Sequence, residues 1–514
     1  MTTTPAPARG SSGDLAGRSG HAVVVGAGLA GLAAAIRLAA RGVRVTVLER
    51  EDQPGGRAGR LERDGYAFDT GPSVMTMPAL LAELFTLGGD DLAEHVDLVR
   101  LDPAYRATFH DGSVLSVRGS VPAMVDEVRT AISPAEADRF ARFAAHLERL
   151  YEAEYATFID ANFAGPHSLL RPVALARLIR LGGFRRVYPL VASHLTDWRL
   201  QRLFTFQAMY AGMSPYQALG VYAIIAYMDS IAGVYAVRGG VHEVSRALAG
   251  LAERLGVELR LGSEVTGVDV ADGRARGVVT ADGERTPADV VVLNPDLPVA
   301  YDQLLPAEAR PRRLARLAYS PSCVVVHLGL DRRLDGAAHH NIHFAEDYRA
   351  SFDDILAGHL QRDPSWFLSV PTVTDPELAP PGGEVGYWLL PAPNLRGDPI
   401  DWDAQAPREL ARAQRLIEAA GYGPVREATV TSEVVTPADW ARQGMAAGTP
   451  FAVSHVFRQT GPFRPRNVAP TVGGVVFAGS STTPGVGVPM VLVSGKLAAE
   501  RVLAHLGVAD RRRA

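Results

Sequence analysis

Three glycines near the start of the chain are spaced for binding a diphosphate. Residues 26–31 read Gly-Ala-Gly-Leu-Ala-Gly and follow the apolar run 21–25. With this spacing one glycine makes a tight turn, one lets the backbone approach a pyrophosphate, and one allows close helix packing. Glu49 ends the next apolar run, 43–48, at the spacing expected for an acid that binds a ribose hydroxyl. The pattern predicts a dinucleotide site.

A second glycine-containing loop follows Glu49 and narrows the choice of cofactor. Residues 54–58 read Pro-Gly-Gly-Arg-Ala, and residues 68–74 read Phe-Asp-Thr-Gly-Pro-Ser-Val. Glycine lets the backbone come close to a ligand, and Arg57 presents a rigid fork of donors to phosphate or flavin carbonyl oxygens. A plain NAD-binding domain does not need this loop. Because the loop follows the first motif, binding of a flavin nucleotide is favoured over the alternative role, an exposed surface turn.

A third loop with unusual composition lies near the end of the chain. Residues 479–489 read Gly-Ser-Ser-Thr-Thr-Pro-Gly-Val-Gly-Val-Pro, between the apolar run 475–478 and the helix-like run 491–503. The two prolines exclude a helix within the loop. A helix N-terminus with exposed amides is expected to follow, and its dipole would stabilise negative charge on a reduced flavin ring.

These loops define the expected cofactor site, and FAD is the expected cofactor. The residues that we expect to bind it are Gly26, Ala27, Gly28, Leu29, Ala30, Gly31, Glu49, Arg50, Gly56, Arg57, Gly71, Pro72, Ser73, Val265, Gly479, Pro484, Gly485, Gly487, Val488 and Pro489. No metal is expected. The single cysteine, Cys323, excludes a disulfide framework and a cysteine-built metal site, and it fits a reducing cytoplasm.

Length and composition set outer limits on the class of protein. The 514 residues predict two or three domains, and 47% apolar with 21% charged residues is typical of a globular protein. The net charge of -4 argues against nucleic acid as the main partner. The apolar run closest to membrane-spanning length, 219–237, is interrupted by Asp229 and Ser230. The first 20 residues, rich in Thr, Pro, Ala, Gly and Ser, predict a disordered leader instead of a secretory signal.

The elements that must position the three loops are separated along the chain. After the first strand–helix–strand unit, residues 239–240 begin a predicted helix, a strand, a hairpin around Asp272 and a further strand ending at Leu293. We therefore expect an α/β fold: a Rossmann-like FAD-binding domain assembled from discontinuous segments, plus a mixed α+β substrate domain with a helical cap. The expected boundaries are 1–20 for the leader, 21–79, 239–296 and 471–506 for the FAD-binding domain, 80–238 and 297–470 for the substrate domain, and 507–514 for a tail.

The ordered set of motifs resembles a known family. The matching segments extend from about residue 21 to 503; they are 24–32, 54–58, 68–72, 204–208, 233–240, 338–340, 461–465 and 482–489. In this order they resemble bacterial-type phytoene desaturases of the carotenoid pathway, within the flavin amine-oxidase-like superfamily. The resemblance implies FAD and hydride transfer to flavin. The implied reaction introduces double bonds into a C40 polyene precursor, towards neurosporene or lycopene.

Three alternatives share part of this pattern. A related carotenoid isomerase, ketolase or other desaturase would carry nearly every motif. An amine oxidase would share the FAD half, but the sequence shows no cage for a cationic substrate, and Cys323 lies outside the flavin motifs. A non-enzymatic lipid-escort protein of the guanine-dissociation-inhibitor type would not need Arg57 or the glycines of 485–487.

One segment suits contact with the membrane that holds an apolar precursor. Within 169–204, apolar residues alternate with arginines, and Asp197 is the one acid; the arginines are Arg171, Arg177, Arg180, Arg185, Arg186, Arg199 and Arg202. Such a basic amphipathic region can lie in the interface and attract anionic headgroups. The alternative is a cap-domain helix pair with a solvated arginine face. Together with the family resemblance, this segment predicts that the protein binds peripherally to the inner face of the cell membrane.

Asp229 is the expected catalytic base. It lies in an apolar and aromatic stretch, where desolvation would raise its pKa towards a useful value. The resembled family usually has an acidic residue near this position, more often Glu than Asp. Asp69, Asp197 and His340 are further candidates, each with a structural role as the alternative.

Overall fold

The computed structural model describes residues 20–163 and 172–508. The predicted leader lies outside the described residues except for Gly20, as does the predicted tail beyond residue 508. Residues 169–171 of the predicted basic segment, including Arg171, also lie outside them.

Within the described residues, five parallel strands form the sheet that carries the first glycine loop, in the order β19-β13-β1-β2-β9. They are β1 (His21–Val25), β2 (Arg44–Leu48), β9 (Glu258–Arg260), β13 (Val290–Leu293) and β19 (Val475–Phe477). Strands β1 and β13 are valine-rich and buried along their whole length, as expected for a parallel sheet covered on both faces. Strands from three distant segments thus form one sheet, which confirms the α/β class and the Rossmann-like arrangement.

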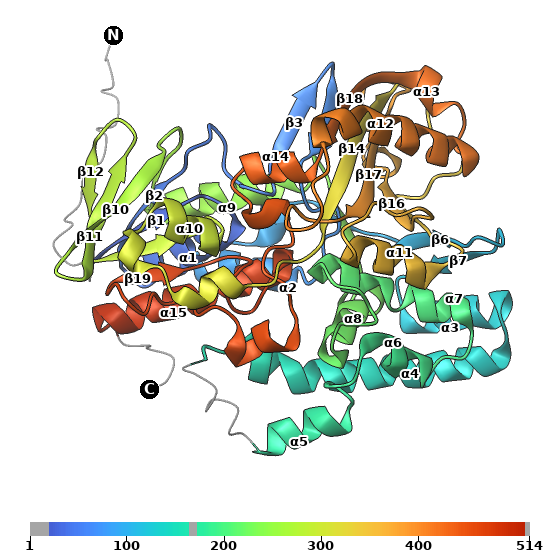
Figure 1. The fold of residues 1–514 in the computed structure, drawn as a ribbon, viewed down its shortest axis with the longest axis horizontal. Helices are drawn as coiled ribbons and strands as arrows, with labels where there is room; N and C mark the ends of the chain where they lie inside the picture. The colour runs from blue at the N-terminus through green and yellow to red at the C-terminus, as the bar shows by residue number, and fades with distance from the viewer. Residues whose placement is uncertain (1–19, 164–171, 509–514) are drawn as a thin grey trace, which may run out of the picture.

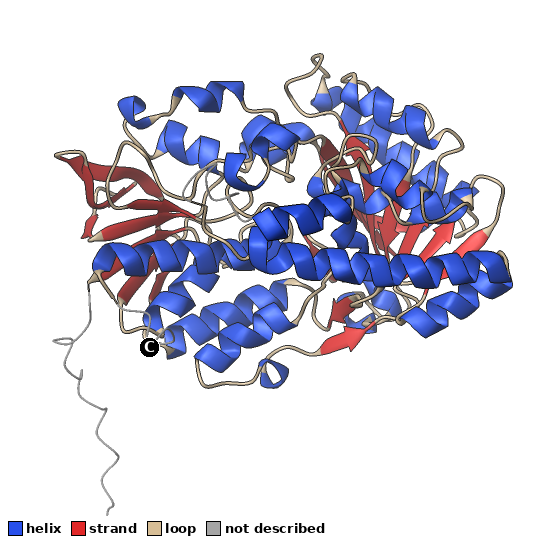
Figure 2. Ribbon diagram, turned by 90° about the horizontal axis from the view of Figure 1, so that it is seen from below, coloured by secondary structure: helices blue, strands red, loops and turns tan. Residues whose placement is uncertain are grey.

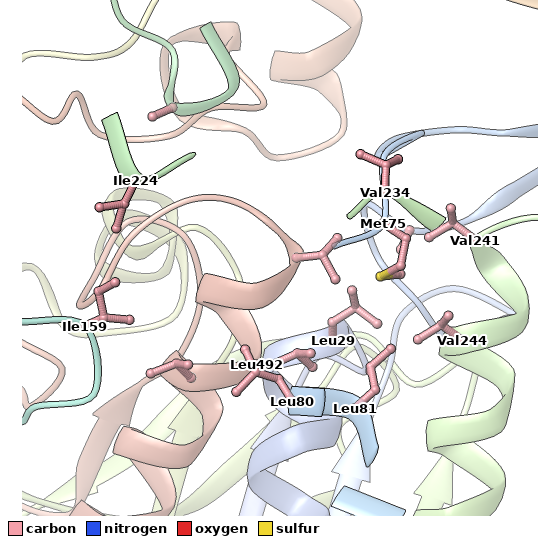
Figure 3. Packing of buried hydrophobic residues seen from close by; sticks show 14 of the residues in the cluster. Leu29, Met75, Leu80, Leu81, Ile159, Ile224, Val234, Val241, Val244 and Leu492 are labelled. Carbon is pink, nitrogen blue, oxygen red and sulfur yellow. The ribbon is translucent and has the colours of Figure 1, made fainter. Parts of the chain in front are cut away.

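In the described part of the chain, helices α1 (Leu29–Ala39), α9 (His242–Arg254) and α15 (Val488–Leu506) pack against this sheet, and α2 (Ala79–Leu87) packs on α1 and α15. Helices α15 and α1 pack closely. A Cβ at Gly495 would lie only 2.5 Å from the carbonyl oxygen of Ala30, so glycine is needed at this contact. Leu29, Leu80, Leu81 and Leu492 from these helices gather in one part of the core (Figure 3). Sequence segments more than 400 residues apart therefore share a single apolar cluster.

An antiparallel sheet of β10 (Val265–Ala271), β11 (Arg274–Thr280) and β12 (Arg285–Pro287) lies at one end of the molecule (Figure 1). The hairpin expected around Asp272 is present. Asp272 and Gly273 have φ angles of 52° and 70°, as a tight two-residue turn between antiparallel strands requires.

In the same described part of the chain, seven strands form a second, mixed sheet in the order β18-β14-β17-β16-β15-β6-β7. They are β6 (Tyr105–Thr108), β7 (Val114–Val117), β14 (Ser322–Leu330), β15 (His340–His343), β16 (Trp366–Ser369), β17 (Glu384–Ala392) and β18 (Thr429–Val435). Strands β6 and β15 pair in parallel and connect the two long insertions into one sheet. Figure 1 shows this sheet on the opposite side of the molecule from the β10–β12 sheet.

Helices cover the second sheet. On one side lie α3 (Val121–Ala131), α4 (Pro134–Glu154), α5 (Pro172–Arg180), α6 (Val187–Ala192), α7 (Trp198–Leu203) and α8 (Ile224–Ser230), with α11 (Tyr348–Leu356) between them and the strands (Figure 1). Helix α4 is 21 residues long and extends along the molecule (Figure 2). The remaining helices are α10 (Leu297–Gln303), α12 (Trp402–Ala419), α13 (Val425–Ala428) and α14 (Pro437–Arg442), and two strand pairs, β3 (Arg60–Arg63) with β4 (Tyr66–Asp69) and β5 (Leu98–Arg100) with β8 (Tyr235–Val237), link the parts.

Candidate functional site

The carboxyl ends of the parallel strands meet at one crevice. Gly26 follows β1, Glu49 follows β2, Asn294 follows β13 and Gly479 lies just beyond β19. In open α/β sheets, ligands bind outside these strand ends. A cavity of about 1090 Å³ includes this crevice, and all the predicted cofactor residues except Ala27 and Gly31 line it.

Ala27 and Gly31 shape the first loop from behind the cavity wall. The backbone N–H of Ala27 donates to Oε2 of Glu49 over 2.6 Å. A side chain at Gly31 would lie 2.2 Å from the carbonyl oxygen of Gly26, so only glycine lets the helix start this close to the strand. Glu49 is buried and accepts a second backbone bond from Glu51 over 3.1 Å, and these two bonds leave further lone pairs of its carboxylate for a ribose hydroxyl.

The glycine loops leave space where side chains would block a nucleotide. A Cβ at Gly28 would lie 2.6 Å from Oδ1 of Asn294. Gly28 also pairs with Gly55 in a parallel bridge, so the first and second loops are in contact. Gly487, with φ of 110°, faces the same cavity from the third loop. The three loops together form a narrow crevice of backbone amides and small residues, which fits the diphosphate and ribityl parts of FAD.

Arg57 joins the second loop to the third. Its Nη1 donates to the carbonyl oxygen of Pro450 over 3.0 Å and to Oγ of Ser480 over 3.2 Å. Its Nη2 lies 3.9 Å from Oδ2 of Asp296. Asp296 is buried and also accepts from the Ser481 hydroxyl. Sequence reasoning assigned no role to Asp296, although its position three residues beyond the buried strand β13 was a usable signal.

Arg464 braces the third loop from within the protein. It is 1% exposed, and it donates from Nε to the carbonyl oxygen of Thr482 over 2.8 Å and from Nη2 to that of Ser480 over 2.6 Å. Burial lowers its pKa to about 10, so it stays cationic at neutral pH. This role was missed as well; the segment 461–465, noted only as a family motif, contains the residue.

Beyond the loops, the cavity continues between the seven-stranded sheet and helices α5 and α8. Its walls there are apolar and aromatic, and include Phe158, Leu178, Leu219, Ile225, Phe344 and Phe367. Cys323 also lines the cavity, and burial raises the pKa of its thiol, so the thiol stays protonated and unreactive. One cavity therefore combines a dinucleotide crevice with room for a long apolar ligand.

Asp229 lines this apolar part and is 1% exposed. Its Oδ1 accepts a hydrogen bond of 2.6 Å from the Ser230 hydroxyl, and its Oδ2 has no hydrogen-bond partner among the described residues. Burial raises its pKa to about 7, while the polar groups of Ser230, Tyr105 and Gln207 oppose the shift. The hydroxyl of Tyr210 in turn donates to that of Tyr105 over 3.0 Å.

The other three base candidates have structural partners and lie away from the cavity wall. Asp69 accepts from the backbone N–H groups of Val241 and His242 at the start of α9. Asp197 caps α7. His340 contacts the carbonyl oxygens of Ala104 and Ser73, and burial lowers its pKa to about 4. Asp229 alone of the four is placed to meet a ligand in the cavity.

The predicted basic segment lies partly at the cavity opening. Phe184 lines the cavity and faces Phe457, which faces Phe463; all three rings are more than a third exposed. On α5, Val173 and Ile179 are exposed beside Arg177 and Arg180. Arg199 and Arg202, which sequence reasoning placed on the same basic face, instead pair with Asp197 and with the backbone of 345–346. Across residues 20–163 and 172–508, no helix is long and apolar enough to cross a membrane.

Known proteins similar to this chain fit the geometry. Residues 29–503 match the family model described as flavin containing amine oxidoreductase. A phytoene dehydrogenase of Streptomyces griseus is 48% identical over 488 residues, 94% of this chain and 95% of that protein. A zeta-carotene-forming phytoene desaturase of Myxococcus xanthus is 38% identical, over 94% of this chain and 93% of its own. The solved structure of a putrescine oxidase with bound putrescine shares the fold, with a TM-score of 0.61 at 18% identity over 94% of this chain and 99% of that one.

Proposed function

This chain belongs to the flavin containing amine oxidoreductase family, and we propose that it is an FAD-dependent phytoene desaturase that introduces double bonds into a C40 polyene. The family expected from the ordered motifs is confirmed. The observation that carries the proposed reaction is the continuity of the cavity, which joins the dinucleotide crevice to an apolar chamber with one buried acid, Asp229, on its wall.

The three loops would hold FAD. Glu49 would accept hydrogen bonds from the ribose, the first glycine loop would bind the diphosphate, and the third loop would face the flavin ring. When bound, FAD supplies a two-electron acceptor for a hydride. Arg57 and Arg464 keep the second and third loops in register, because both donate to the backbone or side chain of the third loop.

Asp229 would accept the proton. Forming a C=C bond removes two hydrogens from neighbouring carbons, one as a hydride and the other as a proton. With a pKa of about 7, Asp229 is roughly half ionised at neutral pH, so its carboxylate would be able to take the proton. The apolar walls around Asp229 would exclude water from the reacting carbons.

The substrate would enter from a membrane surface. A hydrocarbon polyene gains little by moving from lipid into an apolar tunnel, since about 0.8 kcal/mol per CH₂ is gained only on leaving water. The exposed Phe184, Phe457 and Phe463 at the cavity opening, with Arg180 exposed on α5, suit contact with anionic lipid. We therefore propose a peripheral location on the inner face of the cell membrane.

Expression in cells that accumulate phytoene tests the function. We expect coloured polyenes with additional double bonds, identified by chromatography and absorption spectra, and the spectra also give the number of steps. Folded, flavin-loaded protein that leaves phytoene unchanged would overturn the assignment. Products that contain oxygen or only altered double-bond geometry, shown by mass spectrometry, would indicate a ketolase or an isomerase.

A further inference from the structure

A short strap, residues 160–163, connects the wall of the apolar chamber to α15, the helix that begins at the third loop. The strap follows the π-helical turn Tyr155–Ile159 at the end of α4, and Phe158 and Ile159 of that turn line the cavity. A π-helical turn is rare and often occurs at a functional site. The position of this part of the wall therefore depends on how the strap is held.

An ion pair and hydrogen bonds hold the strap on α15. Nζ of Lys496 lies 2.5 Å from Oδ2 of Asp160. Nδ2 of Asn162 donates to the carbonyl oxygen of Leu497 over 3.1 Å and to Oε2 of Glu500 over 2.8 Å. The strap is thus fixed to residues 496–500 of the helix.

The same part of α15 is fixed to the flavin loops. Oγ of Ser494 accepts a hydrogen bond of 3.0 Å from the backbone N–H of Gly479 in the third loop. At the next position, Gly495, α15 packs against Ala30, which belongs to the first loop and to α1. Lys496 follows. Three consecutive residues of one helix therefore contact the third loop, the first loop and the strap.

Lys496 balances the charge of a shielded carboxylate. The Lys496 and Asp160 side chains are only 28% and 23% exposed, so their attraction is less screened than that of a fully exposed pair. Oδ1 of Asp160 is buried and has no hydrogen-bond partner among the described residues. Without a cation opposite it, an ionised carboxylate in this place is destabilised and is driven towards water. Removal of the Lys496 charge would therefore move the strap.

Resting on the proposed function, we propose that Lys496 is a positioning residue that holds the chamber wall in place relative to the flavin. Through its ion pair with Asp160 it fixes the turn that contains Phe158 and Ile159 to the helix that also carries the third loop. The carbons of a polyene that reach the flavin depend on the wall against which the chain lies. A displaced wall weakens polyene binding and brings other carbons to the flavin, so the KM and the product pattern depend on the ion pair, whereas flavin binding does not.

Charge reversal and charge exchange test this proposal. Lys496→Glu places a second negative charge opposite Asp160. We expect the KM for phytoene in lipid vesicles to rise about tenfold, with kcat changed by less than about threefold and flavin content unchanged. The double variant Lys496→Asp with Asp160→Lys restores opposite charges, and its KM should return to within about threefold of the wild-type value. Ala504→Glu, which adds a negative charge at an exposed position of α15, is the matched control and should leave the KM unchanged.

Hydrogen exchange measured by mass spectrometry gives a readout independent of turnover. Amides of 158–163 should exchange faster in Lys496→Glu and regain protection in the double variant, while those of α1 keep their rates. Unchanged KM and exchange in Lys496→Glu, or a double variant that restores neither, would overturn the proposal. So would loss of flavin in Lys496→Glu, which would assign the residue to the cofactor site. Absence of phytoene turnover by the wild type counts against the desaturase assignment, and the exchange rates then still decide whether the ion pair holds the wall.

Discussion

Arg57 and Ser480 are 423 positions apart in the chain, yet Nη1 of Arg57 donates a hydrogen bond to Oγ of Ser480 over 3.2 Å. The contact joins the loop after the ribose-binding position to the loop expected to face the flavin ring. Asp296, from a third segment, lies 3.9 Å from the same guanidinium. The proposed flavin site is therefore complete only when the three segments that contain Arg57, Asp296 and Ser480 have assembled, and flavin binding should report on that assembly.

Replacing Gly28 by valine should abolish FAD binding. A Cβ at this position would lie 2.6 Å from Oδ1 of Asn294, and the branched side chain would fill the path of the diphosphate. The ratio of flavin to protein absorbance in the purified variant measures this. Gly267→Val is the matched control, because a Cβ at Gly267 has nothing within 4 Å and that residue does not line the cavity. Full flavin content in Gly28→Val would contradict the assigned site.

Replacing Arg464 by glutamine should loosen the third loop. The change removes donors to the carbonyl oxygens of Thr482 and Ser480, and we expect a loss of about 2–4 kcal/mol in the free energy of unfolding. Flavin should also dissociate more readily. Denaturant unfolding and flavin release after dilution measure the two effects. Arg458→Gln, at an exposed position nearby, should change neither; equal effects of the two substitutions would show that Arg464 does not brace the loop.

The flavin half of the site could be predicted because its signals are local in sequence. The run from β1 through α1 to β2 contains the glycine spacing and Glu49 within 29 residues, and short-range spacing determines their relative positions. The third loop was recognisable from its own composition. Its place beside the same cavity as the first loop followed only from the assumption of a Rossmann-like sheet, which the order β19-β13-β1-β2-β9 confirms.

The contacts made by Asp296 and Arg464, and the burial of Glu154, could not be predicted, because they depend on packing between distant segments. On α4, Glu152 is exposed and Glu154 is buried, only two residues apart. An amphipathic pattern read from sequence does not separate them, since the difference depends on the packing of the 3₁₀ turn η5 (Gly220–Ala223) and of α8 against α4. The contacts of the arginines in 169–204 could not be predicted either. Arg199 pairs with Asp197, and Arg202 donates to backbone carbonyl oxygens of residues 345–346, up to 144 positions away.

Acidic substitutions at the cavity opening should weaken membrane binding. Phe457 is 50% exposed and Phe463 is 38% exposed, and burial of a phenyl ring in lipid contributes about 1.5–3 kcal/mol. The double variant Phe457→Asp and Phe463→Asp should bind anionic phospholipid vesicles at least about tenfold more weakly in flotation assays, with flavin content unchanged. Val373→Asp, at a position 48% exposed outside the cavity wall, is the control. Equal flotation of the double variant and this control would contradict the proposed docking surface.

The pH dependence of turnover should follow Asp229. Because the proton acceptor must be ionised, kcat/KM should fall about tenfold per pH unit below pH 7 and reach a plateau above pH 8, given the pKa of about 7. Asp229→Asn should lower kcat by about 10²–10⁴-fold at every pH while flavin stays bound. A variant that retains turnover and the acidic limb would show that another group accepts the proton.

The free energy of unfolding should also depend on pH through Asp229, and it should fall as the pH rises. The pKa of Asp229 is raised from 3.8 to about 7 in the folded protein, so between these values the folded state holds a proton that the unfolded chain has released. The free energy of unfolding contributed by Asp229 is therefore highest below pH 3.8, falls as the pH rises through this window, and stays low above pH 7. Asp229→Asn removes the cost of burying a charge, and at pH 8 it should be more stable than the wild type by about 1–3 kcal/mol in denaturant unfolding. A less stable variant at pH 8 would mean that the ionised carboxylate is well solvated or paired, and its pKa would then lie too low for the proposed role as base.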